Sequence, residues 1–132
     1  MKVLVDTSAW SAVLRRKHPD AHAVAALTKI IDTEEVFVTG VIVQELLSCV
    51  KDRKLFDQIR DVITDVGYVE PAIEDYVAAA GMSTALQTKG VIATTIDLLI
   101  AAIAIRRGMP VLTSDKDFRH IADHTGLKLI EP

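Results

Sequence analysis

The sequence predicts an α/β fold in which a parallel-type sheet of five short strands carries helices on both faces. Half of the 132 residues are apolar and only 5% are aromatic, a composition typical of helices packed on an aliphatic sheet. Short apolar runs alternate along the chain with longer segments of helical periodicity. The length favours one domain over residues 1–132, because it allows a substantial core but not two ordinary ones.

Two strands and four helices are predicted in the first half of the chain. Residues 2–6 form a nearly continuous apolar run that ends in an acid, which is typical of a central strand buried on both faces. A second apolar run at 36–38 is closed by a threonine and a glycine. The spacing of apolar residues predicts the four helices, the last with a charged outer face, over 7–16, 20–31, 41–50 and 51–64.

Three further strands and three further helices are predicted in the second half. Helical periodicity extends from Pro71 to Gly90, with an interruption at Gly81. The most regular helical pattern runs over 96–107 and ends at a glycine. A short helix is predicted around Phe118, between the last two predicted strands. Apolar runs predict the remaining strands at 67–70, 111–113 and 127–130.

Several classes of protein do not fit these bulk features. The longest uninterrupted apolar run, Leu98 to Ile105, is far shorter than the roughly 20 residues of a membrane span. Only three apolar residues separate Lys2 from Asp6, so no signal peptide is expected and we predict a cytoplasmic protein. The single cysteine, Cys49, lies among apolar residues and is interpreted as buried. The high apolar content of so small a chain predicts contact with another chain.

Four acids occupy positions that a parallel sheet would bring together. Asp6 and Asp115 each close an apolar strand. Glu45 and Asp97 interrupt the apolar faces of two helices. Because strand ends and the helix N-termini that follow them share one edge of a right-handed parallel sheet, we expect the four carboxylates to converge there.

Taken singly, these acids also fit common structural roles. The roles are a helix N-cap for Asp6, an exposed position for Glu45, a capping box with Thr94 for Asp97, and a turn position for Asp115 beside a cap pair of Ser114 and Asp117. A shared site differs from these roles in its chemistry. Converging carboxylates repel one another and must take up protons or a cation, and ligands that are all oxygen favour Mg²⁺ or Mn²⁺ over zinc. Such an ion suits the hydrolysis of a phosphodiester.

Four segments of the chain resemble the PIN-domain ribonucleases, especially the VapC toxins of bacterial and archaeal VapBC toxin-antitoxin pairs. These segments are Val-Leu-Val-Asp6-Thr-Ser, Gln44-Glu45-Leu46-Leu47, Asp97-Leu-Leu-Ile-Ala-Ala-Ile-Ala and Val-Leu-Thr113-Ser-Asp115-Lys-Asp117-Phe. The resemblance covers essentially the whole chain. No single segment is specific, but the four in this order form a strong combination.

The resemblance implies a three-layer α/β/α sandwich with a central, mainly parallel five-stranded sheet. It also implies an endoribonuclease that uses Mg²⁺, for which Mn²⁺ substitutes, and that acts as the toxin of a type II toxin-antitoxin system. Carried over by position, the catalytic and metal-binding residues are Asp6, Glu45, Asp97 and Asp115, with Thr113, Asp117 and Ser8 in supporting roles. The family further implies an RNA substrate, a homodimer and a small antitoxin that blocks the site.

Other functions remain open at this point. The chain could be a PIN-like module that binds RNA or protein without cutting it. It could also be a phosphohydrolase that uses the Asp-x-Asp pair Asp115 and Asp117, or a metal-free ribonuclease that uses two of its four histidines for acid–base chemistry.

The net charge of −3 argues against binding to nucleic acid unless the protein also binds cations. Two divalent ions would reverse its sign and leave the basic residues free to meet phosphates. The candidates are Arg15, Arg16, Lys17, Lys51, Arg53, Lys54, Arg106, Arg107, Lys116 and Arg119.

Overall fold

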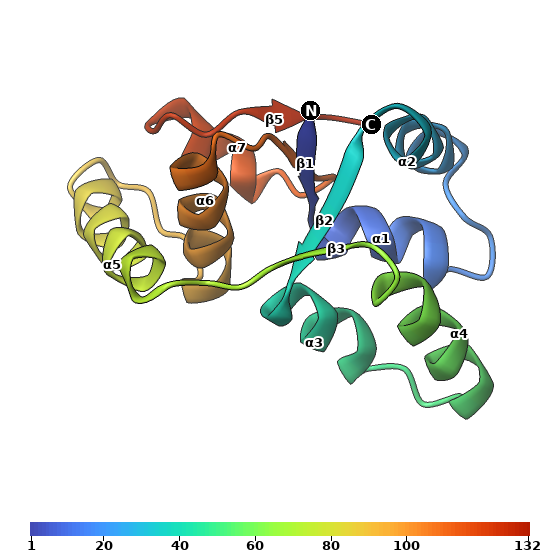
Figure 1. Ribbon diagram of the computed structural model, residues 1–132. Helices are drawn as coiled ribbons and strands as arrows, with labels where there is room; N and C mark the ends of the chain where they lie inside the picture. The colour runs from blue at the N-terminus through green and yellow to red at the C-terminus, as the bar shows by residue number, and fades with distance from the viewer.

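A five-stranded sheet lies at the centre of the computed structural model, which describes all 132 residues (Figure 1). The strand order is β3-β2-β1-β4-β5, and all four pairings are parallel. The carboxyl ends of the strands therefore meet at one edge, as predicted. The strands are β1 (Lys2–Val5), β2 (Glu35–Thr39), β3 (Gly67–Val69), β4 (Val111–Leu112) and β5 (Leu129–Ile130).

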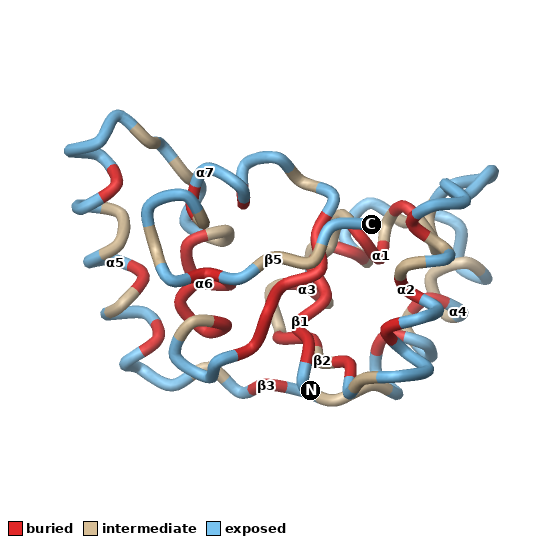
Figure 2. Tube along the Cα trace, turned by 90° about the horizontal axis from the view of Figure 1, so that it is seen from above, coloured by how far each residue is buried: buried red, intermediate tan, exposed pale blue.

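Seven helices cover the two faces of this sheet and complete the predicted three-layer α/β/α sandwich. Figures 1 and 2 show the first four on one side of the sheet and the last three on the other. The chain moves outward through β1, β2 and β3 and then returns past β1 to β4 and β5, so right-handed crossovers place the two groups on opposite faces. The helices are α1 (Thr7–Leu14), α2 (Ala21–Thr33), α3 (Gly40–Ser48), α4 (Arg53–Ile63), α5 (Ile73–Gln87), α6 (Thr95–Arg107) and α7 (Asp117–Asp123).

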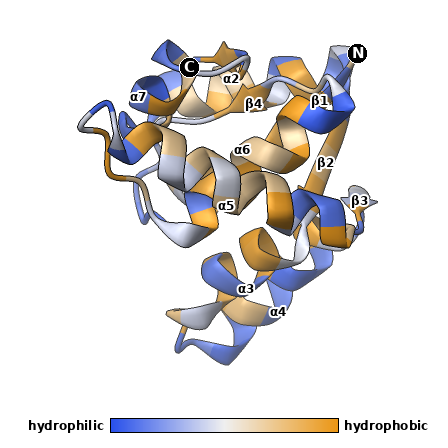
Figure 3. Cartoon of the chain, turned by 90° about the vertical axis from the view of Figure 1, so that its left-hand side faces the viewer, coloured by the Kyte–Doolittle hydropathy of each residue, from blue (hydrophilic) through white to orange (hydrophobic).

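Helix α6 is the most deeply buried helix. Its residues from Leu98 to Ala104 are all buried, so the helix contacts protein on every side (Figure 2). A helix that is apolar all round has no face to offer to water, which explains this central position. By contrast, hydrophilic residues run along α4, as predicted for its outer face (Figure 3). No helix in the structure is long and apolar enough to cross a membrane.

The structure corrects several predictions about local detail. Cys49 is exposed rather than buried, because α3 ends at Ser48 and the next residue turns to solvent. Helix α5 continues through Gly81 without interruption, since Ala79 and Leu86 on either side anchor it in the core. The last strand is shorter than predicted and covers only Leu129–Ile130.

A buried ionic cluster joins the start of α5 to the end of α6. The Asp75 side chain is fully buried, and it accepts hydrogen bonds from Arg106 at 2.6 Å and from Arg107 at 2.8 and 2.9 Å. The backbone N–H of Ala72 also donates to it, at 2.7 Å. Hydrogen bonds from Arg107 hold the pKa of Asp75 well below its usual range, against the opposing effect of burial. The two arginines are therefore used within the fold and are not the free phosphate-binding groups that their charge suggested.

We expect Asp75→Ala to lower the free energy of unfolding by about 3–5 kcal/mol. The change removes the buried carboxylate and leaves Arg106 and Arg107 without the acceptor of their hydrogen bonds. Urea denaturation measures this change. Asp57→Ala is the control, since it removes an acid that also pairs with two arginines, Arg53 and Arg60, but is 41% exposed. The control should cost no more than about 1 kcal/mol. Equal losses in the two variants would contradict a special role for the buried cluster.

Candidate active site

The carboxyl edge of the sheet receives acids from four separate elements. Asp6 directly follows β1, and Asp115 lies three residues beyond the end of β4. Glu45 lies on α3, the helix that follows β2, and Asp97 lies in the first turn of α6. The parallel topology thus delivers all four to the same edge, as predicted from strand ends and helix starts.

Asp6 is the most firmly held of these acids and is only 4% exposed. Its backbone N–H donates to Leu112 O at 3.0 Å, which extends the pairing of β1 with β4 up to the site. The buried Trp10 donates its indole N–H to Val5 O at 3.1 Å and fixes α1 against the end of β1. Asp6 caps α1 by accepting from Ser8 N, so the predicted capping role is real and coexists with a position in the site.

Two hydroxyl groups orient the Asp6 carboxylate. Ser8 Oγ and Thr113 Oγ1 donate to Asp6 Oδ2 at 2.9 and 3.0 Å. Each hydroxyl in turn accepts a backbone N–H at 3.0 Å, from Ser114 and Asp115 respectively. The two hydroxyl oxygens also lie 3.1 Å from each other, so the Ser8 and Thr113 hydroxyls and Asp6 Oδ2 form one hydrogen-bonded group. Oδ1 receives none of these bonds and is left for another partner.

Glu45 is attached to the same site through a residue that the sequence reasoning missed. Thr7 Oγ1 donates to Glu45 Oε1 at 3.1 Å and thereby links α1 to α3. Glu45 is half-buried, so the interpretation of a fully exposed side chain is wrong. Thr7 directly follows Asp6, and its position in that motif was the signal that could have identified it.

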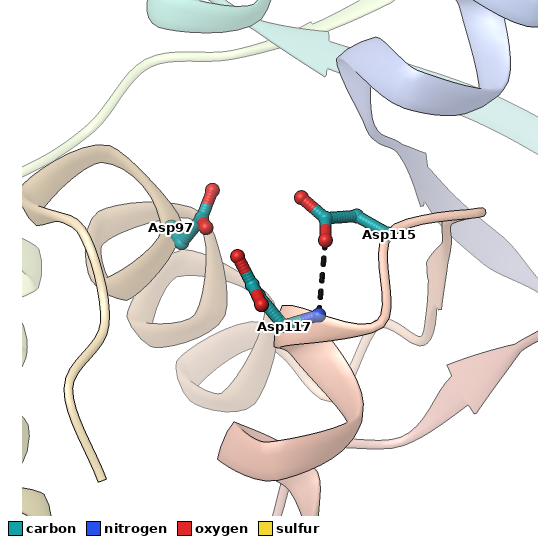
Figure 4. A group of neighbouring side chains, drawn as sticks. All are labelled: Asp97, Asp115 and Asp117. Carbon is teal, nitrogen blue, oxygen red and sulfur yellow. Dashed lines mark hydrogen bonds between the residues drawn. The ribbon is translucent and has the colours of Figure 1, made fainter.

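Asp97, Asp115 and Asp117 form the tightest group of acids. One carboxylate oxygen from each lies within 4.8 Å of the others, and Figure 4 shows the three side chains pointing toward one another. Asp115 Oδ1 also accepts from Asp117 N at 2.9 Å, drawn as the dashed line in Figure 4. The predicted cap pair of Ser114 and Asp117 is therefore replaced by a bond from the backbone N–H of Asp117 to the side chain of Asp115. The carboxylate of Asp117, which was predicted to have a supporting role, thus lies beside two of the four predicted acids.

Capping does not occupy the Asp97 carboxylate. Thr94 Oγ1 accepts from Asp97 N at 3.1 Å, which is one half of the predicted capping box. The reciprocal bond, from the Asp97 side chain to the backbone of Thr94, is not formed. The helix is thus capped by a hydroxyl, while the carboxylate remains available to the site.

The electrostatics of the site favour uptake of a positive charge. Burial raises the pKa of Asp97 to about 6, the charges of Asp6, Asp115 and Glu45 raise it further, and the Thr94 hydroxyl acts in the opposite direction. Burial also raises the pKa of Asp6, although the Ser8 and Thr113 hydroxyls act in the opposite direction. Since burial and mutual repulsion both disfavour the ionised forms, a proton or a cation relieves the cluster.

Comparison with known proteins connects this geometry to a family. The model of the PIN domain matches residues 3–124. The chain is 31% identical over 131 residues to the VapC ribonuclease Mb1587 of Mycobacterium bovis, and the alignment covers 96% of both chains. Ribonuclease VapC11 of Mycobacterium tuberculosis matches with the same identity and coverage.

Solved structures share the fold at lower sequence identity. VapBC2 from Rickettsia felis, bound to a promoter DNA fragment, matches with a TM-score of 0.81 and 21% identity over 99% of this chain and 98% of that one. VapBC from Salmonella typhimurium, also bound to DNA, has the same TM-score and coverage at 16% identity. The extent of the family match and the 31% identity to whole-length relatives show that the chain belongs to the PIN-domain family and, within it, to the VapC ribonucleases.

Proposed function

We propose that this protein is a metal-dependent endoribonuclease and the toxin of a type II toxin-antitoxin pair. The observation that carries the proposal is the meeting of Asp6, Glu45, Asp97 and Asp115 at one edge of the sheet, where burial and mutual repulsion favour a bound cation. These four are the proposed catalytic and metal-binding residues. The kinship with VapC ribonucleases supports RNA as the substrate.

The donor set fits a hard divalent cation. The side chains that meet at the site are carboxylates and hydroxyls, and Mg²⁺ prefers such oxygen ligands. Two ligands of one Mg²⁺ lie about 3–4 Å apart, because each is roughly 2.1 Å from the ion. The oxygens of Asp97, Asp115 and Asp117, which are within 4.8 Å of one another, need only a small contraction to reach this spacing. We propose Mg²⁺, with Mn²⁺ able to replace it.

The residues at the site have different proposed roles around a bound ion. When bound, a divalent ion polarises the phosphate and lowers the pKa of a water molecule for attack on phosphorus. Asp6 presents Oδ1 in a fixed direction, since Ser8 and Thr113 hold Oδ2. Thr7 holds Glu45 toward the same place. Ser8 and Thr113 are therefore proposed as residues that position the ligands, and Asp117, whose carboxylate lies beside those of Asp97 and Asp115, is proposed as a supporting acid.

Two protein partners also belong to the proposal. The structural neighbours include VapBC complexes from Rickettsia felis and Salmonella typhimurium, which supports a small cognate antitoxin that blocks the site. We further propose a homodimer. The exposed apolar side chains of Ile73, Tyr76 and Val77 lie on one face of α5, where they are available to a second chain. The cytoplasm is the compartment in which RNA and antitoxin would be met.

We expect the purified protein to cleave total RNA in the presence of Mn²⁺ and to lose this activity in EDTA. Asp115→Asn should reduce cleavage at least about 100-fold, because it removes a charged ligand while keeping the size of the side chain. Gel analysis of RNA fragments measures both effects. Asp123→Asn, an exposed position at the end of α7, is the matched control and should retain full activity.

The same assay separates the competing functions. Cleavage that survives EDTA would indicate histidine acid–base chemistry instead of metal catalysis. RNA that is bound but remains intact with every metal would indicate a PIN-like binding module. Hydrolysis of a small phosphomonoester without cleavage of RNA would favour an Asp-x-Asp phosphohydrolase.

We expect Thr113→Val to lower kcat about 10- to 100-fold with little change in KM, because the hydroxyl orients the Asp6 carboxylate. Thr113→Ser retains the hydroxyl and should restore most of the activity. Thr33→Val, at the exposed end of α2, is the matched control. A loss confined to KM, or no rescue by serine, would contradict a positioning role.

We expect the metal-free protein to lose stability as the pH rises from 4 to above 6. Asp97 has a pKa of about 6 in the folded chain and 3.8 in the unfolded chain, so between these pH values the folded chain binds a proton that the unfolded chain has released. The stability that this proton provides is lost as the pH rises through about 6. Thermal unfolding in EDTA at pH 5 and pH 7.5 measures the change. Asp97→Asn should raise the midpoint at pH 7.5 by about 4 °C, the shift that corresponds to roughly 1 kcal/mol.

Added Mn²⁺ provides the complementary measurement. The ion should raise the unfolding midpoint of the native protein more at pH 7.5 than at pH 5, because protonated Asp97 binds a cation poorly. Asp123→Asn should behave like the native protein in both solutions. Equal stabilisation by Mn²⁺ at the two pH values would contradict a role for Asp97 in the metal site.

A further inference from the structure

A polar pocket of about 350 Å³ lies directly beside the acid cluster and shares Thr113, Ser114 and Asp115 with it. We call this space the flanking pocket. Its remaining walls come from the first turn of α2, from α7 and from the last residues of the chain, Glu131 and Pro132. A volume of this size is at the lower end of the range for ligand sites in proteins. The position beside Asp115 suggests a place for the part of a substrate next to the scissile bond.

Two cationic side chains on the wall of the flanking pocket are available to an anion. Lys116 forms no ion pair in the structure. Arg119 donates from Nε and Nη2 to a single oxygen of Glu131, at 3.1 and 2.8 Å, and its Nη1 forms no hydrogen bond. Because Arg119 and Glu131 are both more than half exposed, their ion pair is weak and can be exchanged for another anion.

The lining indicates which part of a nucleic acid would enter. The flanking pocket has one apolar lining residue, Ala23, and its single aromatic ring is the imidazole of His22. Recognition of single-stranded bases usually depends on stacking against several aromatic rings, and this pocket has no Phe, Tyr or Trp in its lining. Phosphate, by contrast, is bound by lysine and by the planar fork of arginine. The chemistry therefore favours the sugar-phosphate backbone over a base.

We propose that Lys116 and Arg119 bind a phosphate of the RNA strand adjacent to the one at the acid cluster, and so align the strand for cleavage. This inference rests on the proposed function and adds to it a backbone-binding subsite that is independent of base sequence. Arg119 contacts substrate here in exchange for its bond to Glu131. The lining also carries the acids Asp20, Asp115 and Glu131, so Lys116 and Arg119 are the lining side chains that offer positive charge to a phosphate there.

The test measures binding of a fluorescein-labelled single-stranded RNA of mixed sequence by fluorescence anisotropy. Ca²⁺ replaces Mg²⁺, because Ca²⁺ also binds oxygen ligands and its looser geometry is poorly suited to catalysis. Arg119→Gln and Lys116→Gln should each weaken binding about fivefold, and each should reduce the slope of log affinity against log salt by at most about 0.7, the value for one phosphate contact on a single strand, because the two residues share one phosphate.

Two further variants complete the comparison. Lys2→Gln removes the same charge at the amino end of β1, the opposite edge of the sheet, and should bind RNA like the native protein. Arg119→Lys keeps the charge and should retain the native salt slope. Thermal unfolding of each variant checks that the fold is intact, which is expected for such exposed positions.

The outcomes distinguish this inference from the proposed function. Weaker binding and lower slopes for the Arg119→Gln and Lys116→Gln variants, with Lys2→Gln unchanged, support the subsite. Native affinity in both variants, in a protein that still cleaves RNA, overturns the subsite and leaves the ribonuclease proposal standing. A native protein that neither binds nor cleaves RNA overturns both.

Discussion

Repulsion among carboxylates at one buried edge of the sheet is the constraint on which the rest of the site depends. Burial alone makes ionisation of Asp6 and Asp97 unfavourable, and neighbouring negative charges add to the effect on Asp97. No basic side chain forms an ion pair with these acids in the structure. Two hydroxyl groups and one backbone N–H donate to one oxygen of Asp6, Thr7 donates to Glu45, and the N–H of Asp117 donates to Asp115. In the proposed function, the remaining charge is what drives the binding of an ion from solution.

Helix α6 connects the acids at this edge of the sheet with the buried ionic cluster of Asp75, Arg106 and Arg107 at its other end. Asp97 is in its first turn, and Arg106 and Arg107 are in its last turn, about 15 Å farther along the axis. The two arginines are thus out of reach of the acid cluster and instead bind Asp75 of α5. Charges of opposite sign are kept apart along one buried helix, so the ion pair that stabilises the fold does not neutralise the site.

Sequence reasoning succeeded where topology fixes position and was weaker where side-chain direction decides. Asp6 and Asp115 follow buried strands, and parallel pairing alone brings such residues to one edge. The closeness of the Asp117 carboxylate to those of Asp97 and Asp115 could not be predicted, because it depends on how the first turn of α7 is oriented after Asp115. Cys49 was predicted to be buried because its neighbours in the sequence are apolar, but the helix ends one residue before it and the side chain is exposed.

The sequence by itself determined the α/β class, the family and the acids that close strands and begin helices, because these follow from local periodicity and from residue order. Only the tertiary structure decided that Thr7 binds Glu45 and that Arg106 and Arg107 bind Asp75. These partners are more than 30 positions apart in the chain. No local pattern specifies such pairs, since the packing of helices on the sheet selects which distant side chains meet.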